Sequence, residues 1–332
     1  MAPSTRRVVP SDPGGPDAAP AAATPAAPLP VTAAELRAAA ALLLLFVANF
    51  LLAIVFAQPF FDAGLQAFKD PENVGNSVGY LVLVLAFTFL ILYIAKKGKK
   101  WLIRAIILGA VASTVGYVVY PVLYITLGWT SGAALGVALA AAAAATIALA
   151  VHPEWYVIDA VGLLVAAGAA SVFGISLGIL PVIVLLVLLA VYDAIAVYKT
   201  KHMLSLADSV IELRLPVLLV IPKVMGYSFR REATRMRDAS ADTKGEREAM
   251  FMGLGDLVMP TILVVSALHF AEPGWGSLPS LGAALGTLVG YGILMSFVLK
   301  GNPQAGLPLL NGGAILGFLV GLYAATGSVA FW

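Results

Sequence analysis

Two aspartates, Asp193 and Asp256, are the charged residues that lie deep inside the long apolar segments of this chain. An ionisable side chain in the hydrocarbon of a bilayer costs about 2.5–3.5 kcal/mol on insertion scales, so such a residue marks a functional site by default. Two carboxyl groups a few ångströms apart do not both ionise, and one stays protonated. The ionised group can take a proton from water while the protonated group polarises a substrate carbonyl. This chemistry hydrolyses a peptide bond with neither a metal nor a covalent nucleophile.

The residues beside each aspartate suit such a site. Asp256 ends the sequence Gly253-Leu254-Gly255-Asp256, in which two glycines leave room for another backbone to approach. Tyr192 directly precedes Asp193. Its phenol is expected either to hydrogen-bond within the site or to anchor the helix near the membrane interface, and both interpretations stay open.

The composition identifies the class of protein that holds these aspartates. The chain has 332 residues, of which 61% are hydrophobic and 11% charged, and its mean hydropathy is +0.95. These values indicate a polytopic membrane protein whose partner is the lipid bilayer. The net charge is only +2 and the basic residues are confined to particular loops, so no nucleic-acid partner is expected. Cysteine is absent, which excludes disulfides, thiol catalysis and cysteine metal sites.

Segments of about 20 apolar residues, the length that crosses the hydrocarbon, recur along the chain. They predict an all-α fold of nine transmembrane helices, with the fifth shorter than the others. Eight remain possible if the region 157–198 is divided differently. The nine expected segments are residues 36–57, 78–95, 102–126, 132–151, 157–173, 179–198, 250–270, 278–299 and 307–326.

Lysine and arginine are concentrated in alternate loops, chiefly around residues 96–104 and 199–249, whereas the opposite loops are mostly acidic. This pattern predicts a cytoplasmic N-terminus and an extracellular C-terminus. Asp193 then lies about five residues from the cytoplasmic end of its segment and Asp256 about six, which at 1.5 Å per residue is about 8–9 Å inside the same membrane face. The two carboxyl groups are therefore expected to meet.

The rest of the chain divides into a tail, a membrane domain and one long loop. Residues 1–34 are rich in proline and alanine and are expected to be a disordered tail. Residues 35–332 form the membrane domain, with Thr32 and Glu35 as a capping box at its first helix. Residues 199–249 are expected to be a solvated, partly disordered cytoplasmic loop. Its apolar run, 215–222, is interpreted either as a re-entrant piece or as a patch lying on the bilayer.

Glycines recur at every fourth position in the last two predicted helices. This spacing puts small residues on one face, where they allow two helices to approach closely. The stripes consist of Gly282, Gly286 and Gly290 in one helix and Gly313, Gly317 and Gly321 in the next.

The two aspartate motifs and a proline motif in the last span resemble the presenilin and signal peptide peptidase family of intramembrane aspartyl proteases. The resemblance covers residue 36 to the end, and the chain resembles in particular an archaeal presenilin homologue. It implies that Asp193 and Asp256 are catalytic, that no cofactor is needed and that transmembrane proteins or peptides are the substrates. The Tyr192 and Gly253-Leu254-Gly255 positions are implied to support the site.

The proline motif departs from the family pattern. The family has Pro-Ala-Leu beside the catalytic pair, in contact with the substrate backbone, whereas this chain reads Pro308-Leu309-Leu310. The resemblance still implies a substrate-binding role for these three residues. No oligomeric state follows from the sequence.

Other functions can be weighed against this one. A proton or cation transporter or channel is the main alternative, because acidic pairs also relay protons and bind cations. A structural membrane protein would leave both carboxylates unexplained. The three histidines, His152, His202 and His269, are scattered, so no metal site is expected. Asp159 lies near the start of the fifth span and is interpreted as a helix N-terminal charge favoured by the dipole.

Overall fold

The computed structural model of the chain describes residues 31–200, 218–231, 248–271, 277–300 and 304–330. The predicted disordered tail lies outside these ranges, except for its last residues. The helices are α1 (Ala33–Asp62), α2 (Gly75–Lys96), α3 (Lys100–Pro121), α4 (Ser131–Val151), α5 (Trp155–Ser176), α6 (Ile179–Ile195), α9 (Leu254–Phe270), α10 (Ser277–Val298) and α11 (Gly306–Thr326). Single π-helical turns follow α3 and α6, and two short strands are β1 (Leu218–Pro222) and β2 (Ala249–Gly253).

In the described part of the chain, eight helices are long and apolar enough to cross a membrane, and α9 is a shorter apolar helix of 17 residues. This agrees with the nine expected segments. The expectation of a short fifth helix is wrong, since α5 has 22 residues. Its serines do not interrupt it, because Ser171 Oγ donates to the Ala167 carbonyl at 2.6 Å and Ser176 Oγ donates to the Val172 carbonyl.

The start of α1 is fixed by the predicted capping box. Glu35 N–H donates to Thr32 Oγ1 at 3.2 Å, and Thr32 N–H donates to Glu35 Oε2 at 3.1 Å. The other carboxylate oxygen, Glu35 Oε1, lies 3.1 Å from Lys223 Nζ, just after β1. The first helix and the segment after β1 therefore meet at one end of the bundle.

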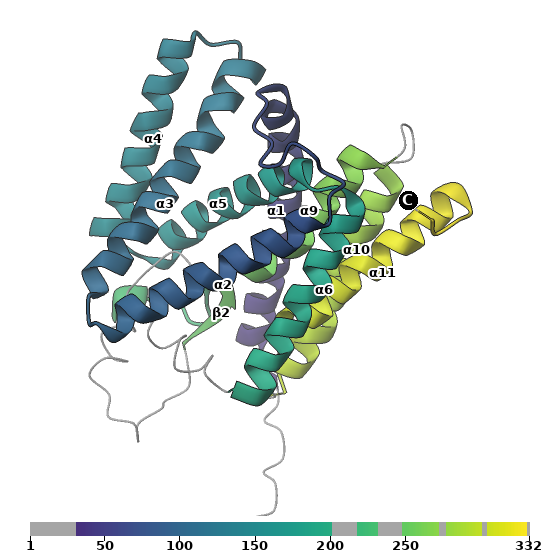
Figure 1. Ribbon diagram of the computed structural model, residues 1–332. Helices are drawn as coiled ribbons and strands as arrows, with labels where there is room; N and C mark the ends of the chain where they lie inside the picture. The colour runs from purple at the N-terminus through teal and green to yellow at the C-terminus, as the bar shows by residue number, and fades with distance from the viewer. Residues whose placement is uncertain (1–30, 201–217, 232–247, 272–276, 301–303, 331–332) are drawn as a thin grey trace, which may run out of the picture. The chain divides into compact units, whose positions relative to one another are not determined.

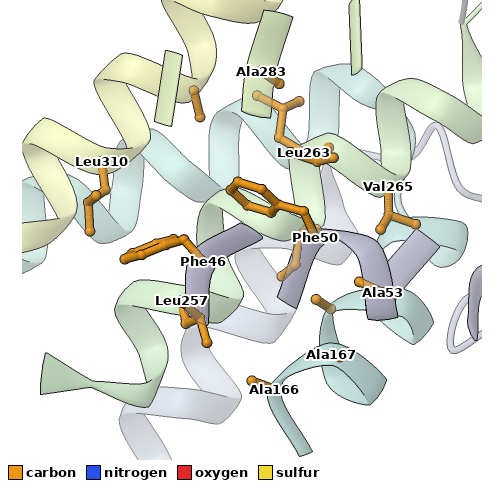
Figure 2. Close-up of a cluster of buried hydrophobic side chains, with 14 of the residues drawn as sticks. Phe46, Phe50, Ala53, Ala166, Ala167, Leu257, Leu263, Val265, Ala283 and Leu310 are labelled. Carbon is orange, nitrogen blue, oxygen red and sulfur yellow. The ribbon is translucent and has the colours of Figure 1, made fainter. Parts of the chain in front are cut away.

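A continuous core forms where α1, α5, α6, α9, α10 and α11 pack together (Figure 2). On α1, Leu42, Phe46, Phe50 and Ala53 recur at spacings of three and four and share one buried face. Figure 2 shows this face against small and branched side chains of the neighbouring helices, among them Ala166, Ala167, Leu257, Leu263 and Val265. The helices that carry the two aspartates are thus anchored in one core.

The close helix approach predicted from the glycine stripes is confirmed, and the two stripes lie against each other where α10 and α11 run side by side (Figure 1). A Cβ placed on Gly286 would come within 2.8 Å of Gly317 Cα and closer still to the Gly313 carbonyl oxygen. Gly282 faces Gly317 and Gly321 in the same way. Backbone meets backbone along this seam, so no side chain fits there.

The antiparallel pair β1–β2 is a feature that the sequence did not predict. Leu218 pairs with Gly253, Val220 with Phe251 and Pro222 with Ala249. Leu219 and Val220 are fully buried, so the expectation of a solvated loop is wrong for residues 218–222, as is the interpretation as a surface patch on the bilayer. The re-entrant interpretation stays a prediction. Because β2 takes up residues 249–253, the seventh helix begins at Leu254 instead of residue 250.

Candidate active site

The two aspartates lie at facing helix ends. Asp193 is the third residue from the end of α6, and Asp256 is the third residue of α9. The two helices contact each other, and the Asp193 and Asp256 carboxyl groups are close enough to interact electrostatically. The structure therefore brings the pair together. Asp256 lies nearer the start of its helix than the sequence suggested, because the helix begins four residues later.

The Gly-x-Gly-Asp spacing has a local explanation in helix capping. Gly253 is the N-cap of α9, in an extended conformation with φ −64° and ψ 137°. Asp256 is three residues later, and a Cβ placed on Gly253 would lie 3.4 Å from Asp256 Oδ2, so the carboxyl group lies beside the N-cap. A carboxylate three residues after the N-cap lies where the helix dipole favours negative charge. The first turn of α9 therefore holds the Asp256 side chain in place.

Both carboxyl groups converge on one short piece of backbone, the start of α11. Leu307 N–H donates to Asp193 Oδ2 at 3.1 Å. A Cβ placed on Gly306 would lie 3.2 Å from each Asp256 carboxylate oxygen. N–H groups in the first turn of a helix have no partner within that helix. They are therefore available to Asp193.

Gly306 is a site residue that the sequence analysis missed. Its signal was present, because it directly precedes Leu307-Pro308, and proline is tolerated in the first turn of a helix. A glycine there permits the close approach of α11 to Asp256. By contrast, Gly255 has open space where its Cβ would be, with no other atom within 4 Å.

The proline motif has two sides. Leu310 is fully buried in the core, and a Cβ on Gly290 of α10 would meet the Leu309 carbonyl and Leu310 Cα. Pro308 and Leu309 are partly exposed. Leu309 and Leu310, at the end of the motif, therefore pack against α10. Gly306 and Leu307, which precede the motif, contact the aspartates.

Tyr192 and Asp193 point in different directions, as neighbours on a helix do. Asp193 is 5% exposed, whereas Tyr192 is 44% exposed. No hydrogen bond to the Tyr192 hydroxyl is found among the described residues. Of the two interpretations of Tyr192, its exposure favours a position at the outer surface of the bundle.

Two buried asparagines, which the sequence analysis also missed, brace the helices that carry the aspartates. Asn49 of α1 donates through Nδ2 to Thr261 Oγ1 at 2.8 Å and to the Leu257 carbonyl at 3.4 Å, one residue after Asp256. Asn311 of α11 donates through Nδ2 to the Leu186 carbonyl of α6 at 3.0 Å. Because an unpaired amide in the bilayer interior is unfavourable, these bonds specify how the helices pack.

The histidines take part in other contacts. His152 Nε2 lies 2.8 Å from the Tyr156 hydroxyl oxygen, and the His269 ring lies 4.4 Å from the Phe61 ring. His202 is outside the described residues. Within those residues, no three His, Asp or Glu side chains gather in a way that could hold a metal ion.

Comparison with known proteins gives a family. The family model described as signal-peptide peptidase, presenilin aspartyl protease matches residues 43–327. Two solved structures of a presenilin family intramembrane aspartate protease, in space groups C222 and P2, are 42% and 43% identical to this chain. Each match covers 86% of this chain and 99% or 97% of the solved chain, with TM-scores of 0.65 and 0.64. A search of curated proteins finds no match. The family match extends over nearly all of the helical part, and the chain therefore belongs to the signal peptide peptidase and presenilin family of intramembrane aspartyl proteases.

Proposed function

We propose that Asp193 and Asp256 are the catalytic pair of this protease, and that it is an endopeptidase that cleaves transmembrane proteins or peptides. The observation that carries the proposal is the convergence of both carboxyl groups on Gly306 and Leu307. Two carboxyl groups from different helices, held at one point of a third helix, form a preorganised acid–base pair.

In the proposed reaction the pair shares one proton. The ionised carboxylate removes a proton from a water molecule, and the resulting hydroxide adds to the carbonyl carbon of the scissile peptide. The protonated carboxyl group donates its proton to the carbonyl oxygen, which gives a gem-diol. The C–N bond then breaks as the leaving nitrogen takes a proton from one carboxyl group and a gem-diol hydroxyl gives its proton to the other. A carboxyl end and an amine end are released, and the pair again holds one proton. The two groups titrate as a unit, so neither is assigned one fixed role.

We further propose that substrate backbone lies beside the first turn of α11 and the Gly255 face of α9. Pro308 and Leu309 are partly exposed there, and Gly255 leaves open space. Leu310 belongs to the same substrate-binding motif and shapes it from the buried side. Tyr192, Gly253 and Leu254 are proposed as supporting residues, of which Gly253 lies beside the Asp256 carboxyl group.

We also propose that the site lies near the cytoplasmic face, with a cytoplasmic N-terminus and an extracellular C-terminus. The basic residues at 96–104 and 199–249 support this orientation. The Lys223–Glu35 ion pair supports it as well, because it joins the start of α1 to the segment between α6 and α9. Residues 35–332 then act as one protease domain, with 199–249 as its cytoplasmic loop.

The test is cleavage of a transmembrane peptide by the protein reconstituted in liposomes. Asp193→Ala and Asp256→Ala should each reduce kcat by about 10³-fold or more, since each removes the general acid–base function. Ion flux measured in the same liposomes tests the alternative that the protein is a proton or cation transporter or channel. Variants that cleave like the wild type while flux collapses would show that the pair serves transport and not proteolysis.

A further inference from the structure

Asp159 of α5 is a buried carboxylate that the proposed mechanism does not use. It is 7% exposed, and its Oδ1 accepts a hydrogen bond from the Val220 N–H of β1 at 2.8 Å. Its other oxygen, Oδ2, is buried without a hydrogen-bond partner among the described residues. The interpretation of Asp159 as a helix N-terminal charge does not account for this bond, because the side chain reaches a strand on another segment.

The hydrogen bond from the Val220 N–H to Asp159 lies on the edge of β1 that faces away from β2. Lys223 N–H donates to the Glu248 carbonyl at 2.8 Å, which fixes the pattern of the antiparallel ladder. Directly opposite pairs alternate between hydrogen-bonded and non-bonded along such a ladder, so the Val220 N–H points away from β2. Pro222, which has no N–H, occupies an equivalent outward-facing position. Asp159 therefore occupies the side of β1 that β2 leaves unpaired.

The same face of α5 also contacts the start of α9. One turn after Asp159, a Cβ on Gly162 would lie 3.4 Å from Leu254 Cδ1 and 3.8 Å from Leu219 Cδ2. Leu219 belongs to β1, and Leu254 is the first residue of α9. Glu154, which directly precedes α5, accepts a hydrogen bond through Oε2 from the Phe229 N–H at 3.1 Å. The segment after β1 is therefore also bonded to the start of α5.

We infer that Asp159 is a positioning residue that fixes Asp256 through the β1–β2 pair. Its bond to Val220 holds β1 against α5, and Val220 pairs with Phe251 of β2. Two residues further on, Gly253 ends β2 and is the N-cap of α9, and a Cβ placed on it would lie 3.4 Å from Asp256 Oδ2. The inference rests on the proposed catalytic role of Asp256.

Substitutions at both ends of the bond test the inference. Asp159→Leu removes the acceptor at similar side-chain size, and it should lower kcat by about 10- to 100-fold, because a displacement near 1 Å at a catalytic group has an effect of this order. KM should change by less than about threefold, since substrate contacts remain. Asp159→Asn keeps the Oδ1 acceptor, and it should restore kcat to within about threefold of the wild type.

The matched control is Ser171→Ala, which changes another buried polar residue of α5. Ser171 Oγ donates to the Ala53 carbonyl of α1 at 2.8 Å, and among the described residues no hydrogen bond joins it to β1 or β2. Its removal should leave kcat within about twofold of the wild type. A loss of kcat in Ser171→Ala equal to that in Asp159→Leu would overturn the inference, because general destabilisation of α5 would then explain both.

A second variant removes the donor of the same hydrogen bond, on β1. Val220→Pro removes the donated N–H without removing a ladder bond, and it should lower kcat as Asp159→Leu does. The double variant should be no worse than the poorer single variant, because both changes remove the same bond. If Asp159→Leu does not fold, this variant decides the question: full kcat in Val220→Pro would overturn the inference.

Backbone hydrogen exchange gives a readout that needs no activity. Asp159→Leu should increase exchange in peptides covering 218–222 and 249–253, whereas Asp159→Asn should not. Unchanged exchange in Asp159→Leu, with Asp193 and Asp256 still essential for cleavage, would overturn the positioning role alone. Increased exchange in Asp159→Leu, with Asp193 and Asp256 variants that cleave normally, would support the hold on the sheet and overturn the proposed function instead.

Discussion

Leu307 donates its backbone N–H to the Asp193 carboxylate across 3.1 Å, and this bond joins the first turn of α11 to the last turn of α6. The residue before it, Gly306, lies against the Asp256 carboxylate. One turn of helix thus contacts both members of the pair. The geometry of the site depends on how closely α11 approaches, and two of the predictions below change that approach.

Gly306 should tolerate no side chain. A Cβ there would lie 3.2 Å from both Asp256 carboxylate oxygens, so Gly306→Ala should displace the carboxylate and lower kcat by about 10- to 100-fold. Gly312→Ala on the same helix is the matched control, because nothing lies within 4 Å of its Cβ position. Peptide cleavage by the two variants measures the difference. Equal activity in both would mean that the contact at Gly306 has no role in the site.

The seam between α10 and α11 should be sensitive to a single added carbon. Gly286→Ala would place its Cβ against the backbone of Gly313 and Gly317, so it should destabilise the protein by about 1–3 kcal/mol or force the helices apart. Gly292→Ala, in open space on α10, should be neutral or stabilise by up to about 1 kcal/mol. Thermal unfolding in detergent compares them. A Gly286→Ala protein as stable as Gly292→Ala would contradict the packing described for the seam.

Asn49 should contribute to the placement of α9. Asn49→Ala removes the donor to Thr261 Oγ1 and leaves a small cavity, so it should cost about 1–3 kcal/mol in the free energy of unfolding. The Leu257 carbonyl also loses a donor, one residue after Asp256, and kcat should fall with stability. Thr326→Ala serves as the control, because among the described residues its hydroxyl bonds to Leu322 and Ser328, at and just after the end of α11. An Asn49→Ala protein with the stability and kcat of this control would exclude the bracing role.

Activity should depend on pH with a single maximum. When pH falls, both carboxyl groups become protonated and no base remains; when pH rises, both ionise and no acid remains. The plot of kcat/KM against pH should therefore fall on both sides. Peptide cleavage across the stable pH range of the protein measures it. A profile that stays flat over several pH units would argue against a shared proton.

A transition-state mimic offers a direct probe of the same pair. A transmembrane peptide with a hydroxyl-bearing carbon in place of the scissile carbonyl resembles the gem-diol, and it should bind about 10²-fold or more tighter than the matching substrate. Binding should be lost in Asp193→Ala. Equal affinity of this variant and the wild type for the mimic would mean that the mimic binds away from the pair.

The sequence predicted the parts of the site that depend on residue type and local spacing. Asp193 and Asp256 stand out because charge is rare in apolar segments, and segment direction is enough to bring them to one end. The Thr32–Glu35 capping box and the glycine stripes were also readable, since each depends on residues three or four apart. Periodicity within one helix carries this information.

The parts that depend on distant pairing were not predictable. Leu219, Val220 and Ile221 are all buried, so β1 lacks the alternation that identifies a strand, and its partner begins about 30 residues later in the chain. The role of Asp159 depends on that strand. Gly306 was missed because a glycine at a helix start has many uses, and only the fold shows that Asp256 lies against it.

The most direct test of the catalytic pair is a double-mutant cycle on kcat. Asp193→Asn, Asp256→Asn and the double variant are reconstituted equally and assayed on one transmembrane peptide under single-turnover conditions. Two groups that act as one unit should show no additivity: each single variant should lose about 10³-fold or more, and the double variant should lose no more than the poorer single. A single variant that retains a tenth of the wild-type rate, or losses that multiply in the double variant, would contradict the pair.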